Sequence, residues 1–174
     1  DQTLFLNLNK LTFLKLDNNK LGYIKKSYFK NMKSLKILHL NDNQISFIES
    51  NSFADQIKLE RLFLNNNALK NLKYGVFNGL KTLEILDLSY NELIILENNL
   101  FDGINNLDRL LLQFNRLESI NSNLFDKLFL IDGIIDLSNN FLKYIFSNRP
   151  EKNEVISLNL ANNFLTQLES IILN

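Results

Sequence analysis

The feature that most constrains this chain is a leucine pattern that returns every 24 residues. It begins as Leu11-x-x-Leu14-x-Leu16-x-x-Asn19-x-Leu21. The same frame recurs with first leucines at 35, 59, 83 and 107. A fixed period of this length is typical of solenoids, in which each repeat buries its apolar face against its neighbours. The repeat therefore predicts one elongated stack rather than a globular core.

Two further copies follow with less regular spacing. One contains Ile135, Leu137 and Asn140, with Asp132 in the place of its first leucine, and the last begins at Val155. The segment 148–153 holds the only proline of the chain and predicts a loop in place of a regular second half-repeat.

The second half of each repeat has its own pattern. A phenylalanine column recurs, followed three residues later by an apolar residue; its members are Phe29, Phe53, Phe77, Phe101 and Phe125. In the copy that starts at 59, the preceding apolar slot holds Gln56 with Ile57 beside it, so we expect the local path to shift by one residue. Residues 1–10 fit the same half-repeat, with Phe5 and Leu8 in its slots.

These motifs resemble the leucine-rich repeat family, in its 24-residue class that carries a phenylalanine. The resemblance covers essentially all 174 residues. The L-x-L segments alternate as short strands do, and one strand per repeat stacks into a parallel sheet. The resemblance implies an α/β solenoid, a curved horseshoe with the parallel β-sheet on its concave face and a mostly irregular or short-helical convex face.

We expect a single array over residues 1–174 rather than several domains. It consists of a half repeat at 1–10 and repeats beginning near 11, 35, 59, 83, 107, 132 and 155. A solenoid exposes an apolar face at each end unless a capping element covers it. We therefore interpret the segment as truncated at both ends, with any cysteine-bearing caps of the family outside it.

The asparagine and phenylalanine columns are best explained by the fold. The asparagine falls where the chain turns off each strand, and a buried turn needs partners for its backbone groups. An amide side chain both donates and accepts, so a stacked column of amides satisfies those groups. The phenylalanines recur only where packing needs them, so neither column predicts a ligand site.

The variable strand positions point out of the sheet, and they are where a binding site can reside. Several are apolar or aromatic although the fold does not require it, and arginine and aromatic residues are enriched at binding hot spots. An exposed apolar patch usually marks a partner, although strand propensity alone also favours such residues. The candidate ligand-binding residues are Arg61, Phe63, Ile85, Asp87, Tyr90, Arg109, Leu111, Gln113 and Phe114.

Charge is balanced overall but uneven along the chain. The formal net charge is zero, which disfavours nucleic acid and membrane surfaces as partners. Residues 10–36 contain eight lysines and one acid, whereas residues 82–108 contain six acids and no basic residue. We interpret most of these charges as solvated convex surface; the alternative is electrostatic steering of a charged partner or contact with an anionic polymer.

Catalysis and cofactors find little support in the residues. The chain has one histidine, His39, and no cysteine, so the usual nucleophile–base pairs and thiolate metal sites cannot be built. The sequence lacks a glycine-rich phosphate loop and a calcium-loop pattern. We therefore predict no enzyme activity, no metal and no cofactor.

The resemblance extends to ectodomains of Toll-like receptors, adhesion receptors and matrix proteins. It implies a protein-recognition segment of a cell-surface or secreted protein that binds through its concave sheet, with any membrane contact made by a segment outside this chain. The alternatives are an intracellular scaffold or adaptor, and a regulatory array attached to an enzyme domain. The absence of N-linked glycosylation motifs in so asparagine-rich a chain weighs slightly against the extracellular setting.

Overall fold

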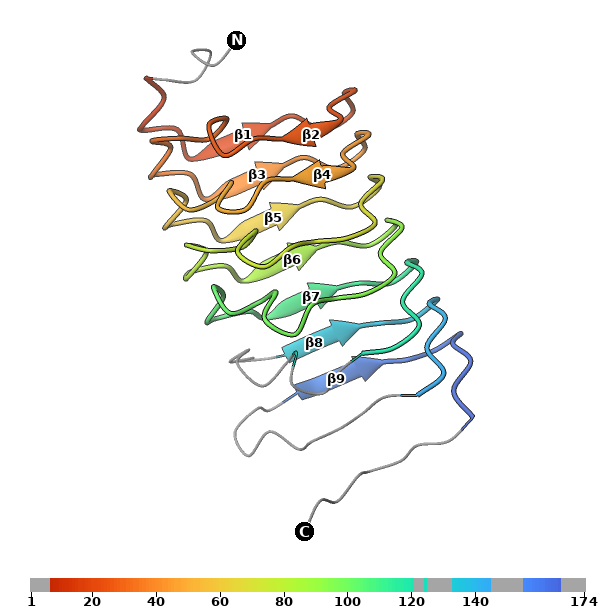
Figure 1. The fold of residues 1–174 in the computed structure, drawn as a ribbon. Helices are drawn as coiled ribbons and strands as arrows, with labels where there is room; N and C mark the ends of the chain where they lie inside the picture. Colours follow the sequence, from red (N-terminus) through yellow and green to blue (C-terminus); the bar gives the residue numbers. More distant parts are fainter. Residues whose placement is uncertain (1–6, 121–123, 125–132, 145–154, 167–174) are drawn as a thin grey trace.

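The computed structural model describes residues 7–120, 124, 133–144 and 155–166, and the chain winds through them as a stack of similar turns (Figure 1). One short strand per turn forms a parallel sheet of seven strands. In spatial order the strands are β1 (Phe13–Lys15), β3 (Ile37–His39), β5 (Arg61–Phe63), β6 (Ile85–Asp87), β7 (Arg109–Leu111), β8 (Gly133–Asp136) and β9 (Val155–Asn159). Spatial order follows chain order, as the 24-residue period predicts.

The register of the sheet places equivalent repeat positions beside one another. Leu14 pairs with Leu38, Leu38 with Leu62, and so on through β7. Successive residues of a strand point to opposite faces, so the central residue of β3, β5, β6 and β7 enters the core and its neighbours face outward. Leu38, Leu62, Leu86 and Leu110 are fully buried, whereas the residues on either side of them are exposed or half-buried.

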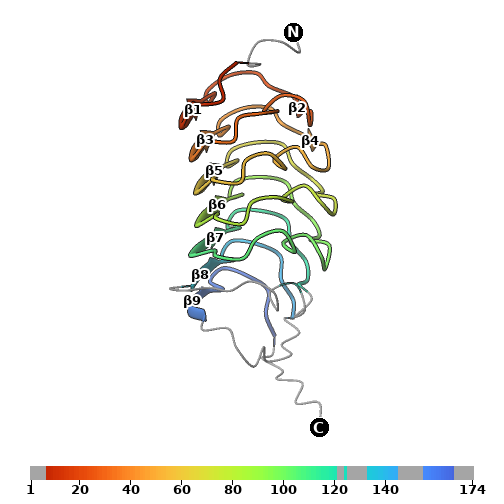
Figure 2. The same ribbon diagram turned by 90° about the vertical axis from the view of Figure 1, so that its left-hand side faces the viewer.

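The return half of each repeat lies opposite the sheet (Figure 2). It consists mainly of turns, with one two-stranded parallel sheet formed by β2 (Tyr23–Ile24) and β4 (Phe47–Ile48). No α-helix occurs among the described residues. The predicted solenoid with its parallel sheet is confirmed, and its return side is of the irregular kind.

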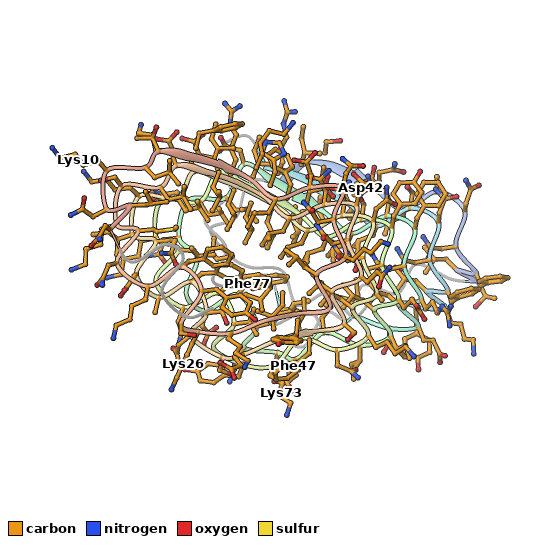
Figure 3. All side chains as sticks on the ribbon, turned by 90° about the horizontal axis from the view of Figure 1, so that it is seen from above. Lys10, Lys26, Asp42, Phe47, Lys73 and Phe77 are labelled. Atoms are coloured by element: carbon orange, nitrogen blue, oxygen red, sulfur yellow. The ribbon has the colours of Figure 1, made fainter. Side chains whose placement is uncertain are left out.

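The core runs between the sheet and the return turns. The phenylalanine column is buried, and its rings stack in pairs: Phe29 on Phe53 with centroids 5.9 Å apart, and Phe77 on Phe101 at 6.0 Å. Figure 3, which looks down the stack, shows Phe77 in the interior while Lys26 and Lys73 lie on the outside. These rings fill the wide half of each turn, which the strand leucines cannot reach.

The asparagine column joins each repeat to the one before it. Asn91 donates to the carbonyl oxygens of Leu64 at 3.0 Å and Leu88 at 3.1 Å, and its side-chain oxygen accepts the Leu69 backbone N–H at 3.0 Å. The same three contacts recur, one repeat along each time, at Asn43, Asn67, Asn115, Asn140 and Asn163. The structural interpretation of this column is therefore correct.

The expected one-residue shift at Gln56 is wrong. Gln56 is fully buried in the apolar slot, and Ile57 is half exposed. The side-chain nitrogen of Gln56 donates to the Phe29 carbonyl oxygen at 2.6 Å, while Gln56 Oε1 is buried without a partner. The 24-residue register therefore overrides the preference of an amide for water and of an isoleucine for the core.

Gln56→Leu is expected to raise the free energy of unfolding by about 1 kcal/mol, because a buried acceptor without a partner costs roughly 1–3 kcal/mol. The Phe29 carbonyl oxygen keeps its bond from the Met32 N–H at 3.2 Å. Urea unfolding followed by circular dichroism measures the change. The exposed Gln44→Leu serves as control, and a less stable Gln56→Leu variant would show that the amide is needed.

The last two strands are less regular. β8 and β9 pair in parallel with a register shift at Gly133/Ile134. The Asp132 slot, Phe5, Phe125 and the expected loop at 148–153 lie outside the described residues. Leu8, at the start of the described chain, is exposed rather than buried.

Candidate functional site

The outward residues of the seven strands form columns on one surface, which we call the sheet face. The first column places Ile85 between Arg61 and Arg109, as predicted. Both arginines are exposed, and within the described part of the chain neither forms an ion pair. Two guanidinium groups that have no acidic partner among the described residues thus flank a half-buried apolar residue.

The next column places Asp87 between Phe63 and Leu111. All three side chains are half-buried. Asp87 Oδ1 accepts the backbone N–H of Ser89 at 3.0 Å and its hydroxyl at 2.6 Å. Asp136 accepts from the Ser138 backbone N–H in the same way. Asp87, a candidate site residue, therefore also stabilises the turn that follows its strand.

Aromatic rings on the sheet face gather in two separate groups. His39 stacks on Phe63 with centroids 4.5 Å apart, and Phe13 meets the His39 ring edge-on at 5.5 Å. Tyr90 stacks on Phe114 at 4.4 Å, with the ring planes 11° apart. We call Tyr90 and Phe114 the ring pair. The candidate aromatic residues thus belong to two stacks, and Phe63 has its ring contact with His39.

The ring pair stands on an unusual backbone. The residue before the column asparagine has a positive φ in all seven repeats: 56° at residue 18, 54° at 42, 54° at 66, 52° at 90, 57° at 114, 55° at 139 and 55° at 162. Asparagine and aspartate tolerate this left-handed conformation, and they occupy the five positions other than 90 and 114. An aromatic residue there is strained by an amount on the order of 1 kcal/mol.

The polar members of this column bond to one another along the edge of the sheet. Asn66 donates to Asp42 at 2.8 Å, and Asn162 donates to Asn139 at 3.0 Å. At the start of the array, Asn18 donates to the Asp17 carboxylate at 2.9 Å and lowers the pKa of that carboxyl group below its ordinary value. The ring pair interrupts this ladder at the fourth and fifth repeats.

Gln113 lies beside the ring pair at the end of its strand. Its side chain is half-buried, and Gln113 Oε1 is buried without a hydrogen-bond partner. Because this oxygen is buried, a partner reaches it only if the Gln113 side chain turns outward, where it can then accept a hydrogen bond.

Phe13, His39, Phe141 and Phe164 were not among the predicted site residues. Phe141 and Phe164 are exposed and stack with centroids 5.8 Å apart and planes 8° apart. They occupy the position after the column asparagine, where earlier repeats have Glu92 and Arg116, an ion pair at 3.2 Å. The sequence signal that could have identified Phe141 and Phe164 was the recurrence of phenylalanine at one repeat position.

A cavity of about 260 Å³ opens on the return side, away from the candidate residues. Lys26, Phe29, Asp55 and Gln56 are among its lining residues. Gly79 holds the same slot as Asp55 one repeat later, and a Cβ there would come within 2.5 Å of the Ala54 carbonyl oxygen. Asp55 excludes so close an approach between the first two return turns, and the cavity lies between them.

We searched the described part of the chain for metal clusters and membrane-spanning helices. It contains no group of three or more His, Cys, Asp or Glu side chains placed to hold a metal ion. None of the described segments is a helix long and apolar enough to cross a bilayer. On the sheet face, the described residues offer an open surface with exposed rings and two guanidinium groups that form no ion pair among those residues.

Comparisons with known proteins agree with the repeat geometry. The family model described as "Leucine rich repeat" matches residues 9–69 and again 57–117. No curated protein matches the sequence.

Three similar solved structures each give a TM-score of 0.79. In a Toll–Spatzle complex from Drosophila, 94% of this chain aligns at 21% identity with 23% of the other chain. In a TLR13–ssRNA13 complex, 96% aligns at 25% identity with 24% of that chain. In the leucine-rich repeat domain of APL1B, 96% aligns at 23% identity with 48% of that chain. This chain thus spans about a quarter to a half of the chains that it resembles.

Proposed function

Because this chain belongs to the leucine-rich repeat family, we propose that it is a protein-recognition segment that binds its partner on the sheet face. The single observation that carries the proposal is the gathering of exposed rings and unpaired arginines on a surface whose fold needs neither. Arginine, tyrosine and tryptophan are enriched among the few residues that contribute most of the binding energy in protein interfaces. The proposed contact residues are Arg61, Phe63, Ile85, Asp87, Tyr90, Arg109, Leu111, Gln113 and Phe114.

The similar structures support a binding role. One is a complex of Toll with the protein Spatzle, and another is a complex of TLR13 with ssRNA13. We propose a protein partner for this chain rather than a nucleic acid, because its net charge is zero and six acids without a basic residue fall within residues 82–108. We further propose an extracellular or cell-surface setting and no catalytic role.

The proposal is tested with Arg61→Ala combined with Arg109→Ala. Partners are first found by passing the purified chain over a panel of recombinant extracellular proteins in surface plasmon resonance. For such a partner, the double variant is expected to bind at least about tenfold more weakly, since hot-spot arginines contribute more than about 1 kcal/mol each. Thermal unfolding is expected to stay unchanged, because both side chains are exposed and form no ion pair in the described chain.

Lys58→Ala with Lys81→Ala provides the matched control. Like the arginine double variant, it removes two positive charges, but from exposed positions on the return half. A partner that loses affinity equally with both double variants responds to net charge alone and contradicts the proposal. A partner that is lost only with the lysine variant binds elsewhere and contradicts it as well.

A further inference from the structure

The ring pair stands where the fold itself prefers a small polar residue. Five of the seven repeats place asparagine or aspartate at this left-handed position, and only Tyr90 and Phe114 depart from them. Strained residues of this kind persist where the surrounding structure holds them, and they gather at functional sites. The two departures are adjacent and in contact, so they form one surface element.

The rings contribute little to the core. Tyr90 is 48% exposed and Phe114 is 43% exposed. The neighbouring amides are engaged on their far sides, since Asn66 donates back to Asp42 and Asn139 accepts from Asn162. These amide bonds run away from both rings, and the stack remains open to a partner.

The two repeats that carry the ring pair are acidic in sequence. Residues 84–118, which include both rings, contain seven acids and two arginines, a net charge of −5. One of the two, Arg116, is already paired with Glu92. A net negative charge attracts cations, and aromatic rings bind guanidinium and ammonium groups through their π faces.

We propose that the ring pair binds an arginine- or lysine-bearing segment of the protein partner. This inference rests on the proposed function and adds the chemistry of the partner to it. The cation stacks against Tyr90 and Phe114, where the acidic repeats favour its approach. An acidic segment or an RNA strand would meet repulsion at this place.

The test is a titration of the whole chain followed by NMR of its aromatic side chains. The probes are the peptides Gly-Arg-Gly-Arg-Gly and Gly-Glu-Gly-Glu-Gly and an oligouridylate. We expect the arginine peptide to shift the ring resonances of Tyr90 and Phe114 and the other two probes to leave them unchanged. Equal shifts with the glutamate peptide or the oligouridylate, or no shift with the arginine peptide, would overturn the inference.

The double variant Tyr90→Asn with Phe114→Asn separates a binding role from a structural one. Asparagine is the residue that the fold uses at the same position in neighbouring repeats, so the midpoint of thermal unfolding is expected to stay equal or rise. Affinity for the arginine peptide is expected to fall at least about fivefold, as the loss of a cation–π contact implies. A midpoint lowered by several degrees would show that the ring pair serves the fold, and unchanged affinity would show that the rings do not bind the cation; either result would overturn the inference.

The two proposals fail in different ways. If the arginine peptide does not bind but the Arg61/Arg109 double variant still loses its partner, only the cation inference is wrong. If that double variant keeps its partner and the peptide still shifts the ring pair, the cation site exists without the proposed sheet-face contact.

Discussion

Asn91→Ala is expected to lower the free energy of unfolding by about 2–4 kcal/mol, because a buried polar group left unsatisfied costs roughly 1–3 kcal/mol. The substitution leaves the Leu69 backbone N–H without its side-chain acceptor and removes one donor each from the Leu64 and Leu88 carbonyl oxygens. Those carbonyls keep the amides of Asn67 and Asn115. The largest part of the loss therefore comes from the orphaned N–H.

Chemical denaturation of the unmodified chain and of the Asn91→Ala variant measures this loss of stability. Asn98→Ala is the control: it makes the same change at an exposed position, where substitutions usually alter stability by less than about 0.5 kcal/mol. Asn91→Asp tests the cause, since it keeps an acceptor for Leu69 and removes the donors. Equal stability of the Asn91→Ala and Asn98→Ala variants would mean that the amide column does not hold the repeats together.

Phe77→Ala is expected to have a still larger effect, a loss of about 3–5 kcal/mol, as other buried phenylalanines show when truncated. Phe77 is fully buried and stacks on Phe101. The space that it leaves lies in the core between the sheet and the return turns, and backbone hydrogen bonds fix the path of those turns, so neighbouring side chains cannot close it completely. Loss of the stacked ring adds to the cost of the cavity.

The matched control for this variant is Tyr74→Ala, which removes an aromatic side chain that is 55% exposed in the same return turn. Thermal and urea unfolding of both variants give the comparison. We expect the Tyr74 variant to remain within about 0.5 kcal/mol of the unmodified chain. A loss at residue 77 no larger than that at residue 74 would contradict the assignment of the phenylalanine column to the core.

Most of the fold could be predicted from the sequence because it follows from one period. A 24-residue spacing fixes which strand pairs with which, so the spacing alone identifies the neighbours of Leu62 and Leu86. The asparagine at the turn was explained by its hydrogen-bonding capacity alone. Irregular repeats were harder to anticipate, and β8 and β9 indeed pair with a register shift.

The prediction from residue polarity was wrong where the repeat register determines which side chain is buried. Gln56 is polar and Ile57 apolar, yet the register buries the first and exposes the second. A single side chain cannot move the turn, because backbone hydrogen bonds such as those from the Gln56 and Leu59 N–H groups fix its path.

The candidate site could be predicted only as columns. The pairing of Arg61, Ile85 and Arg109 followed from register, but ring contacts depend on side-chain directions that periodicity does not contain. For this reason the contact between His39 and Phe63 was missed. The left-handed backbone under Tyr90 and Phe114 was also missed, because it becomes visible only when the dihedral angles of all repeats are compared.

The asparagine column, whose amides join each repeat to the one before it, also affects how such a chain can change in evolution. Each of these asparagines joins one repeat only to the repeat before it, so a 24-residue unit can be duplicated or deleted without interrupting the rest of the column. Duplication of the unit that carries Tyr90 would extend the ring pair by one step and leave all other contacts in register. The sheet face of such an array can therefore lengthen by recombination between repeats and change afterwards by point mutation.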